Sequence, residues 1–268
     1  MPIGNVNGIR LSYEETGSGD PVVMIMGSGS GGRAWHLHQV PALVSAGHRV
    51  ITFDNRGIPP TDVCATGFTI EDLVGDVLGL MEKLRLGPVR VVGTSMGAYA
   101  AQELALHHPQ MVRQAVFMAS RARSDALRRY LAHAERDLYE SGAALPPRYQ
   151  AVVLAMQCLS SRTLDDEQTV ADWLDLLEMA RQDEAGKGAQ LRLDPMPDRR
   201  SAYARISVPC HVISFADDLI TPPRAGEELA AVIPGATFEV IPDAGHYGYL
   251  ENPEAANKSI LEFFRSRT

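Results

Sequence analysis

The chain has 268 residues, of which 45% are hydrophobic, so it can bury a large core. Its net charge of −8 argues against nucleic acid and against an anionic membrane surface as partners. The three cysteines have no metal-like spacing, which argues against a disulfide framework and a structural metal. The sequence shows no signal-like start and no apolar run of membrane-spanning length, so we expect a cytoplasmic protein.

The first part of the chain alternates strands with helices. The pattern predicts strands at 3–6, 10–15, 22–26, 49–53, 89–92 and 112–118, and an Asn7–Gly8 hairpin turn between the first two. It predicts helices at 34–46, 69–84 and 95–108, with Thr69 as an N-cap. Such alternation is typical of a mostly parallel sheet with helices on both faces.

Residues 121–204 interrupt this alternation. They contain helical stretches at 124–139, 147–159 and 165–181, and strands resume only at 208–215 and 236–241, with helices at 222–232 and 252–265. We therefore expect a core formed by residues 1–120 and 205–268, and a helical lid formed by residues 121–204. The strand before the lid ends at the carboxyl edge of the sheet, so the lid should cover that edge. The apolar side chains of the lid, such as Trp173, should then select the substrate.

The central motif is Gly93-Thr94-Ser95-Met96-Gly97, between the predicted strand at 89–92 and the helix that follows it. In a nucleophile elbow, the serine occupies a strained turn from strand to helix, and glycines two residues away on each side allow close approach of the backbone. The helix N-terminus also favours negative charge at this point. The motif predicts that Ser95 is a nucleophile.

A serine nucleophile needs a base and an acid that orients the base. Among eight histidines, His246 follows the strand at 236–241 on a loop at the same sheet edge, whereas the others favour surface or packing roles. Asp217 and Asp218 follow the strand that ends at Phe215. The order Ser, Asp, His is the one expected for this fold. Spacing alone leaves both aspartates open, and the second would cap the helix near Pro222 or bond to the loop backbone.

The glycine-rich stretch 27–32 follows the buried strand at 22–26. An oxyanion hole needs two backbone N–H groups, and we expect them from Ser28 and Met96. Gly27, Gly29 and Trp35 are the expected substrate-binding residues, and His36 and His38 are further candidates for the pocket wall. The alternative, a dinucleotide-binding loop, is weakly supported, so no cofactor is predicted.

Together these segments resemble the α/β-hydrolase superfamily over nearly the whole chain. The resemblance rests on the Ser95 motif, Asp54-Asn55-Arg56-Gly57, the stretch 217–223, and Gly245-His246 followed by Glu251-Asn252-Pro253. It implies an eight-stranded, mostly parallel sheet with a helical lid, and it places the acid at Asp218. Two segments depart from the family pattern: Met26-Gly27 stands where His-Gly is common, and Ile58-Pro59-Pro60-Thr61 replaces Gly-x-Ser.

The resemblance implies a serine hydrolase that cleaves a small-molecule ester or thioester of moderate size, which a carrier protein can hold, through an acyl-enzyme intermediate. Three alternatives remain open. The protein is also similar to acyltransferases that move carrier-bound acyl groups in bacterial secondary metabolism, and to cofactor-free haloperoxidases with the same triad. A non-catalytic ligand-binding protein on this fold is the third alternative. The sequence does not predict the oligomeric state.

Overall fold

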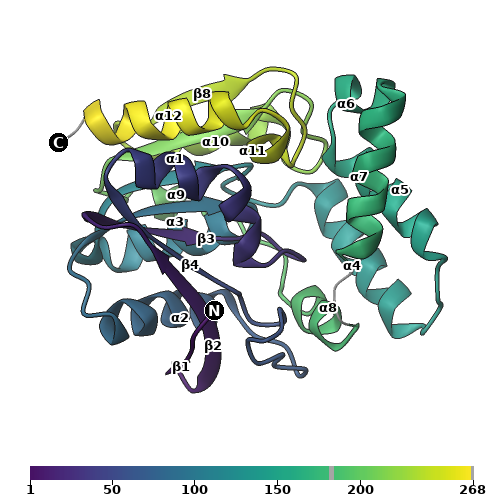
Figure 1. The fold of residues 1–268 in the computed structure, drawn as a ribbon, viewed down its shortest axis with the longest axis horizontal. Helices are drawn as coiled ribbons and strands as arrows, with labels where there is room; N and C mark the ends of the chain where they lie inside the picture. The colour runs from purple at the N-terminus through teal and green to yellow at the C-terminus, as the bar shows by residue number, and fades with distance from the viewer. Residues whose placement is uncertain (181–183, 267–268) are drawn as a thin grey trace.

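The computed structural model describes residues 1–180 and 184–266. Within them, eight strands form one sheet in the order β1-β2-β4-β3-β5-β6-β7-β8 (Figure 1). The strands are β1 Ile3–Val6, β2 Ile9–Thr16, β3 Asp20–Ile25, β4 His48–Phe53, β5 Val89–Thr94, β6 Val112–Met118, β7 Cys210–Phe215 and β8 Thr237–Ile241. The pairs β1–β2 and β2–β4 are antiparallel and the remaining pairs are parallel. The predicted fold class is confirmed.

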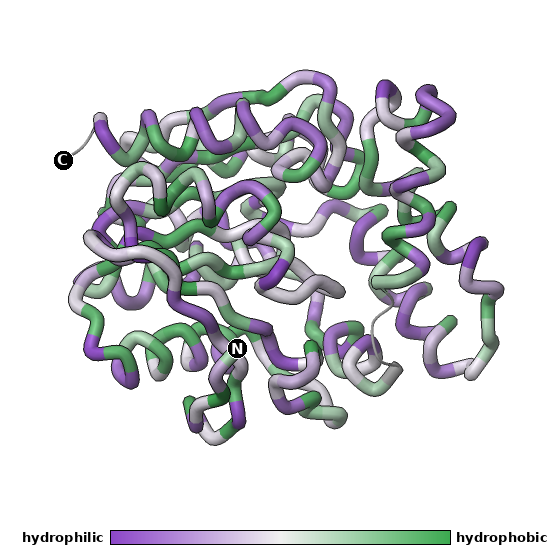
Figure 2. The backbone as a smooth tube through the Cα atoms, in the orientation of Figure 1, coloured by the Kyte–Doolittle hydropathy of each residue, from purple (hydrophilic) through white to green (hydrophobic). Residues whose placement is uncertain are grey.

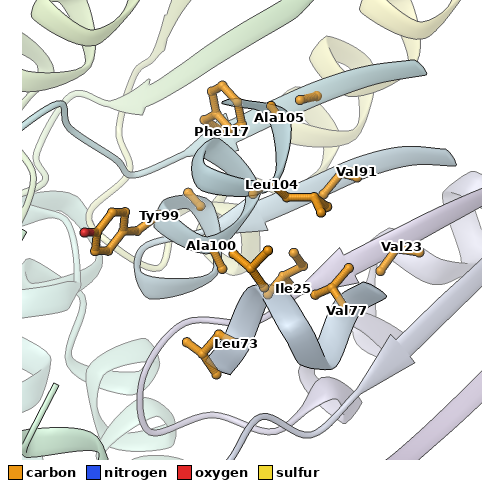
Figure 3. Packing of buried hydrophobic residues seen from close by; sticks show 14 of the residues in the cluster. Val23, Ile25, Leu73, Val77, Val91, Tyr99, Ala100, Leu104, Ala105 and Phe117 are labelled. Carbon is orange, nitrogen blue, oxygen red and sulfur yellow. The ribbon is translucent and has the colours of Figure 1, made fainter. Parts of the chain in front are cut away.

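Helices cover both faces of the sheet because successive strand residues point to opposite faces. On β3, Val23 and Ile25 belong to the core under α2 (Ile70–Lys83), α3 (Met96–His107) and α10 (Pro223–Val232), as Figure 3 shows for the first two helices. Val22 and Met24 belong to the opposite core, under α1 (Gln39–Ser45) and α12 (Pro253–Ser266). The central strands are therefore apolar on both sides, as the run at 22–26 predicted.

Local sequence signals explain several element boundaries. Thr69 forms a capping box with Asp72 at the start of α2, as its predicted N-cap role requires. Asn7 and Gly8 both have positive φ, 46° and 79°, which suits the predicted two-residue hairpin turn. The predicted helix at 34–46 is instead a 3₁₀ helix, Gly32–Leu37, followed by α1. Pro41 lacks the N–H that a continuous α-helix would need, so it is accommodated only in the first turn of α1.

Helices follow one another between β6 and β7. They are α4 Ala126–Glu140, α5 Pro147–Cys158, α6 Ser161–Asp165, α7 Glu167–Met179, α8 Glu184–Leu191 and α9 Arg200–Tyr203. Helices α4–α8, called the lid below, stand to one side of the core (Figure 1), and hydrophilic and hydrophobic residues alternate along them (Figure 2). The short helices α6, α8, α9 and α11 (Gly248–Glu251) were not predicted. The last predicted residue of 165–181 lies outside the described residues.

Helix α9 belongs with the core although it falls inside the predicted lid range. The Tyr203 hydroxyl donates to Glu103 Oε1 of α3 at 2.7 Å, and Arg199 just before the helix forms an ion pair with the same carboxylate. Within the described residues, no helix is both long and apolar enough to cross a membrane.

Candidate active site

Ser95 occupies the sharp turn between β5 and α3. Its φ of 54° and ψ of −118° are unusual for a residue with a side chain, which marks a strained position. A Cβ on Gly93 would overlap the backbone of Gly97, and a Cβ on Gly97 would overlap the carbonyl of Ile25, so both positions require glycine. The Ser95 N–H donates to Met118 O of β6 at 3.0 Å. These contacts hold the hydroxyl above the carboxyl edge of the sheet.

The structure brings three of the predicted residues into one hydrogen-bonded series. Ser95 Oγ lies 3.0 Å from His246 Nε2, and His246 Nδ1 lies 2.8 Å from Asp218 Oδ2. A buried carboxylate accepts, so Nδ1 carries the proton and Nε2 is left to accept the proton of the Ser95 hydroxyl. This is the arrangement in which an imidazole acts as a base on a serine.

Asp218, and not Asp217, faces the imidazole. Its Oδ1 accepts the N–H groups of Ile220 and Thr221, both at 2.8 Å, and its Oδ2 accepts the Thr221 hydroxyl at 2.5 Å in addition to His246. Burial opposes ionisation, but the charge of His246 and the hydrogen bonds from His246 and Thr221 outweigh it and lower the pKa of Asp218. The carboxylate is therefore ionised where it can stabilise an imidazolium.

Asp217 instead supports the lid. Its Oδ2 accepts the backbone N–H of Ser161 at 3.0 Å and the Ser161 hydroxyl at 2.8 Å, at the first residue of α6. This is neither of the two roles that the sequence left open for the second aspartate, namely capping α10 or bonding to its own loop. It adds a negative charge at a helix N-terminus, where such a charge is favourable.

The His246 loop is fixed by contacts that sequence reasoning missed. The Tyr247 N–H donates to Cys158 O at 3.0 Å, and a Cβ on Gly245 would meet the same oxygen at 2.5 Å. The Gly245 N–H donates to Glu251 Oε2 at 2.7 Å, and Glu251 Oε1 accepts the Ser160 N–H and hydroxyl, both at 2.8 Å. One carboxylate therefore joins the loop that carries His246 to the start of α6.

The two expected oxyanion-hole residues, Ser28 and Met96, contact each other, and Met96 directly follows Ser95 in the chain. Ser28 Oγ is 3.3 Å from Met96 Sδ. Gly27 packs against Ser95, because a Cβ at Gly27 would be 3.1 Å from Ser95 Cβ. The Asn55 side-chain amide donates to Met26 O at 2.7 Å and fixes the start of the loop. This hydrogen bond supports the loop at the point where Met26 replaces the usual histidine.

The lid also contacts the glycine-rich loop. Gly29 is a predicted substrate-binding residue, and its backbone N–H donates to Gln190 Oε1 of α8 at 2.7 Å. Gln190 Nε2 in turn donates to Arg56 O at 2.9 Å. The backbones of Gly57 and Gly186 also approach so closely that a side chain at Gly186 would overlap Gly57. Helix α8 therefore holds the loop on which Ser28 lies.

The prediction that Trp35 binds substrate is wrong. Its side chain is 0% exposed and packs in the core cluster under α1 and α12, with its ring centroid 4.9 Å from that of Tyr249. The 3₁₀ helix turns this large aromatic side chain toward the sheet, where its burial is favourable. His36, another candidate for the pocket wall, bonds to Thr52 Oγ1 at 3.1 Å on β4.

Two aromatic residues approach the site instead. The half-buried ring of Tyr247 lies 6.3 Å from the ring of His246 and stacks on Trp173 of α7 at 6.3 Å and 21°. Trp173 was predicted as a lid residue, whereas Tyr247 was not selected. Among the described residues, no group of three or more His, Cys, Asp or Glu side chains is placed to bind a metal ion.

Comparison with known proteins identifies the family. A model of the alpha/beta hydrolase family matches residues 22–258. The chain is 47% identical over 259 residues to "Putative non-heme bromoperoxidase BpoC" of Mycobacterium tuberculosis, covering 96% of this chain and 98% of that protein. It is 29% identical over 265 residues to a 2-hydroxy-6-oxononadienedioate/2-hydroxy-6-oxononatrienedioate hydrolase of Cupriavidus pinatubonensis, covering 95% of this chain and 90% of that protein.

The three-dimensional comparison agrees. The solved structure of Rv0554 from Mycobacterium tuberculosis has a TM-score of 0.93 and 47% identity, covering 97% of this chain and 95% of that one. The protein belongs to the alpha/beta hydrolase family.

Proposed function

We propose that the protein is a serine hydrolase that cleaves an ester or a thioester through an acyl-enzyme intermediate on Ser95. The observation that carries the proposal is the series of hydrogen bonds from Ser95 Oγ through His246 to Asp218, with distances of 3.0 Å and 2.8 Å. A serine hydroxyl at its ordinary pKa is a weak nucleophile, and this arrangement supplies the base that activates it.

The proposed reaction has two half-reactions. His246 Nε2 takes the proton as Ser95 Oγ attacks the substrate carbonyl, and the N–H groups of Ser28 and Met96 stabilise the resulting oxyanion. The imidazolium then gives its proton to the leaving alcohol or thiol, which leaves an ester on Ser95. Water, activated by the same imidazole, attacks this ester and releases the acid.

A second candidate activity is perhydrolysis, which the resemblance to BpoC favours. Hydrogen peroxide would replace water in the second half-reaction, so the acyl-enzyme would release a peroxy acid. The peroxy acid would oxidise bromide to hypobromite and return to the carboxylic acid. Ser95, His246 and Asp218 have the same roles in both reactions, since only the nucleophile that attacks the acyl-enzyme differs.

The test is a comparison of the wild-type protein with Ser95→Ala on a panel of p-nitrophenyl esters and acyl thioesters. We expect hydrolysis by the wild type, an acyl adduct on Ser95 by intact mass, and loss of turnover by about 10⁴-fold or more in the variant. Added alcohols or hydrogen peroxide would reveal acyl transfer or perhydrolysis as changed products. A folded Ser95→Ala variant that retained a tenth of the activity would overturn the proposal.

A further inference from the structure

The thioether of Met96 is an oxidisable group beside the nucleophile, and the proposed hydrolysis does not use it. Met96 directly follows Ser95, and its Sδ lies 3.3 Å from Ser28 Oγ. The Ser28 hydroxyl donates to this sulfur, which is a weak acceptor. The backbone N–H groups of Ser28 and Met96 are also the expected oxyanion donors. A chemical change at the sulfur therefore acts on the residues that are expected to stabilise the oxyanion.

The surroundings of Met96 join the core to the site. Its side chain belongs to the core cluster under α2 and α3, and 8% of the residue is exposed. Two of its neighbours are more accessible, since Ser28 is exposed and Ser95 is half-buried. A small oxidant that reaches the Ser95 hydroxyl therefore arrives beside Met96.

Several other methionines differ from Met96 in exposure and position. Met24 and Met26, on and just after β3, are 0% exposed. Met156 and Met179 are exposed, at 56% and 79%, and they lie on the lid helices α5 and α7. These residues allow oxidation at the surface and in the core to be distinguished from oxidation beside Ser95.

The reaction of a thioether with a peroxide is a two-electron oxygen transfer. The sulfur attacks one peroxide oxygen, the O–O bond breaks and an S–O bond forms. Hydrogen peroxide leaves as water, and a peroxy acid leaves as its carboxylic acid. The product is methionine sulfoxide, which is polar where the thioether was apolar. Perhydrolysis, the second candidate activity, would bring both kinds of oxidant to Ser95.

An oxygen added on the side of the sulfur that faces Ser28 does not fit. A hydroxyl and an oxygen acceptor need about 2.5–3.0 Å between them. The present Sδ–Oγ distance of 3.3 Å would have to hold the S–O bond as well. Either the Ser28 loop must move away or the Met96 side chain must turn within a packed core. Both movements displace an expected oxyanion donor, and removal of one such donor costs about 10²- to 10³-fold in kcat.

We propose that Met96 is a redox-sensitive modification site, at which hydrogen peroxide or a peroxy acid forms methionine sulfoxide and thereby stops hydrolysis at Ser95. The loss of activity follows from the displaced oxyanion donors and not from unfolding. This inference rests on the proposed ester hydrolysis at Ser95 for its activity measurement, whereas the position of the added oxygen is measured independently by mass.

The test treats the wild type, Met96→Leu and Met179→Leu with hydrogen peroxide, and each protein is compared with its own untreated sample. Leucine is apolar and similar in volume to methionine, and it has no sulfur to oxidise. Peptide mass spectrometry locates each added oxygen, and hydrolysis of p-nitrophenyl acetate gives the remaining kcat. Circular dichroism establishes that the treated proteins stay folded.

We expect the kcat of the wild type to fall in proportion to the fraction of Met96 that is oxidised, with a loss of about tenfold or more at full oxidation. Met179→Leu should be as sensitive to peroxide as the wild type. Met96→Leu should keep most of its own untreated kcat. An unchanged kcat in a wild type that is oxidised at Met96, or an equal loss in Met96→Leu, would overturn the proposal.

Oxidation of a thiol gives a different result. Burial raises the pKa of the Cys158 and Cys210 thiols to about 12, so neither is a reactive thiolate at neutral pH. Dithiothreitol reduces sulfenic acids and disulfides and leaves methionine sulfoxide in place. Activity that dithiothreitol restores would therefore assign the inactivation to a cysteine such as Cys64 and overturn the proposal.

The mass measurement separates this proposal from the proposed function. If the untreated wild type hydrolyses no ester, the hydrolase assignment fails, and the order of oxidation decides the modification site alone. Oxidation of Met96 ahead of the buried Met24 and Met26 supports the site. A Met96 that stays unmodified while Met179 is fully oxidised overturns it, whether or not the protein hydrolyses esters.

Discussion

Replacing Asp218 by asparagine is the most direct test of the candidate triad. The two oxygens of Asp218 have different partners: Oδ1 accepts two backbone N–H groups, and Oδ2 accepts the Thr221 hydroxyl and His246 Nδ1. An asparagine keeps its single oxygen at the Oδ1 position, because the two N–H groups there need an acceptor. Its amide nitrogen then faces His246 and donates to Nδ1.

This change inverts the tautomer of the imidazole. With Nδ1 accepting from the amide, the proton resides on Nε2, which then points an N–H at Ser95 Oγ and cannot accept its proton. Loss of the correct tautomer in a serine triad costs about 10⁴-fold in kcat, or about 5 kcal/mol of transition-state stabilisation. We expect a loss of this size for Asp218→Asn, and no large change in KM, because the binding surface is unaltered.

The matched control is Asp217→Asn, which makes the same substitution at the adjacent residue. Asp217 bonds to Ser161 of the lid, so we expect a loss of stability of about 0.5–1 kcal/mol and a change in kcat of less than about threefold. Steady-state hydrolysis of p-nitrophenyl acetate measures both variants. The reasoning is refuted if Asp218→Asn keeps more than a tenth of the wild-type kcat, or if Asp217→Asn is the more damaging change.

Three further predictions concern the residues that support the site. Gln190→Ala removes the acceptor for the Gly29 N–H and should lower kcat about tenfold for short and long esters alike, as steady-state kinetics will show. Gly245→Ala places a Cβ 2.5 Å from Cys158 O and should lower the melting temperature by about 3–10 °C in a thermal scan. Trp173→Ala should change the kcat/KM ratio between a bulky and a short acyl ester, and an unchanged ratio in a folded variant contradicts a role in selectivity.

The sequence predicted those parts of the site that depend on local patterns of residues. The elbow glycines flank Ser95 within five residues, and Asp218 and His246 each follow an apolar strand, so the strand pattern alone places all three at one edge. The turn from strand to helix needs glycine for steric reasons that act within a few residues, and such constraints are visible in the sequence.

Contacts between distant segments were not predictable in this way. Gln190 lies 161 residues from Gly29 and Glu251 lies 91 residues from Ser160, and no spacing rule connects either pair. Trp35 was predicted to bind substrate, but the rotation of its short 3₁₀ helix decides the direction of the ring, and that rotation depends on packing against Tyr249. Short helices such as α6 likewise depend on tertiary partners for their stability.

The lid is tied to both halves of the site, to the Ser28 loop by Gln190 and to the His246 loop by Glu251. The second connection leads to a specific expectation. On the lid side, Glu251 Oε1 accepts from the Ser160 N–H, the Ser160 hydroxyl and the Thr163 hydroxyl. On the other side, Oε2 accepts from the Gly245 N–H. In Glu251→Gln, the single oxygen remains with the three lid donors, so the amide NH₂ faces the N–H of Gly245 and repels it.

The loop that carries His246 must then shift, while the lid keeps its own hydrogen bonds. We expect kcat to fall about 10- to 100-fold by a similar factor for short and bulky esters, with KM nearly constant, because a displaced base affects every substrate equally. Ser160→Ala is the matched control, since it removes a lid donor and leaves the Gly245 contact intact, and it should alter kcat much less. If Glu251→Gln instead changes the selectivity between esters and leaves kcat for the short ester intact, the carboxylate acts through the shape of the lid and not through the position of His246.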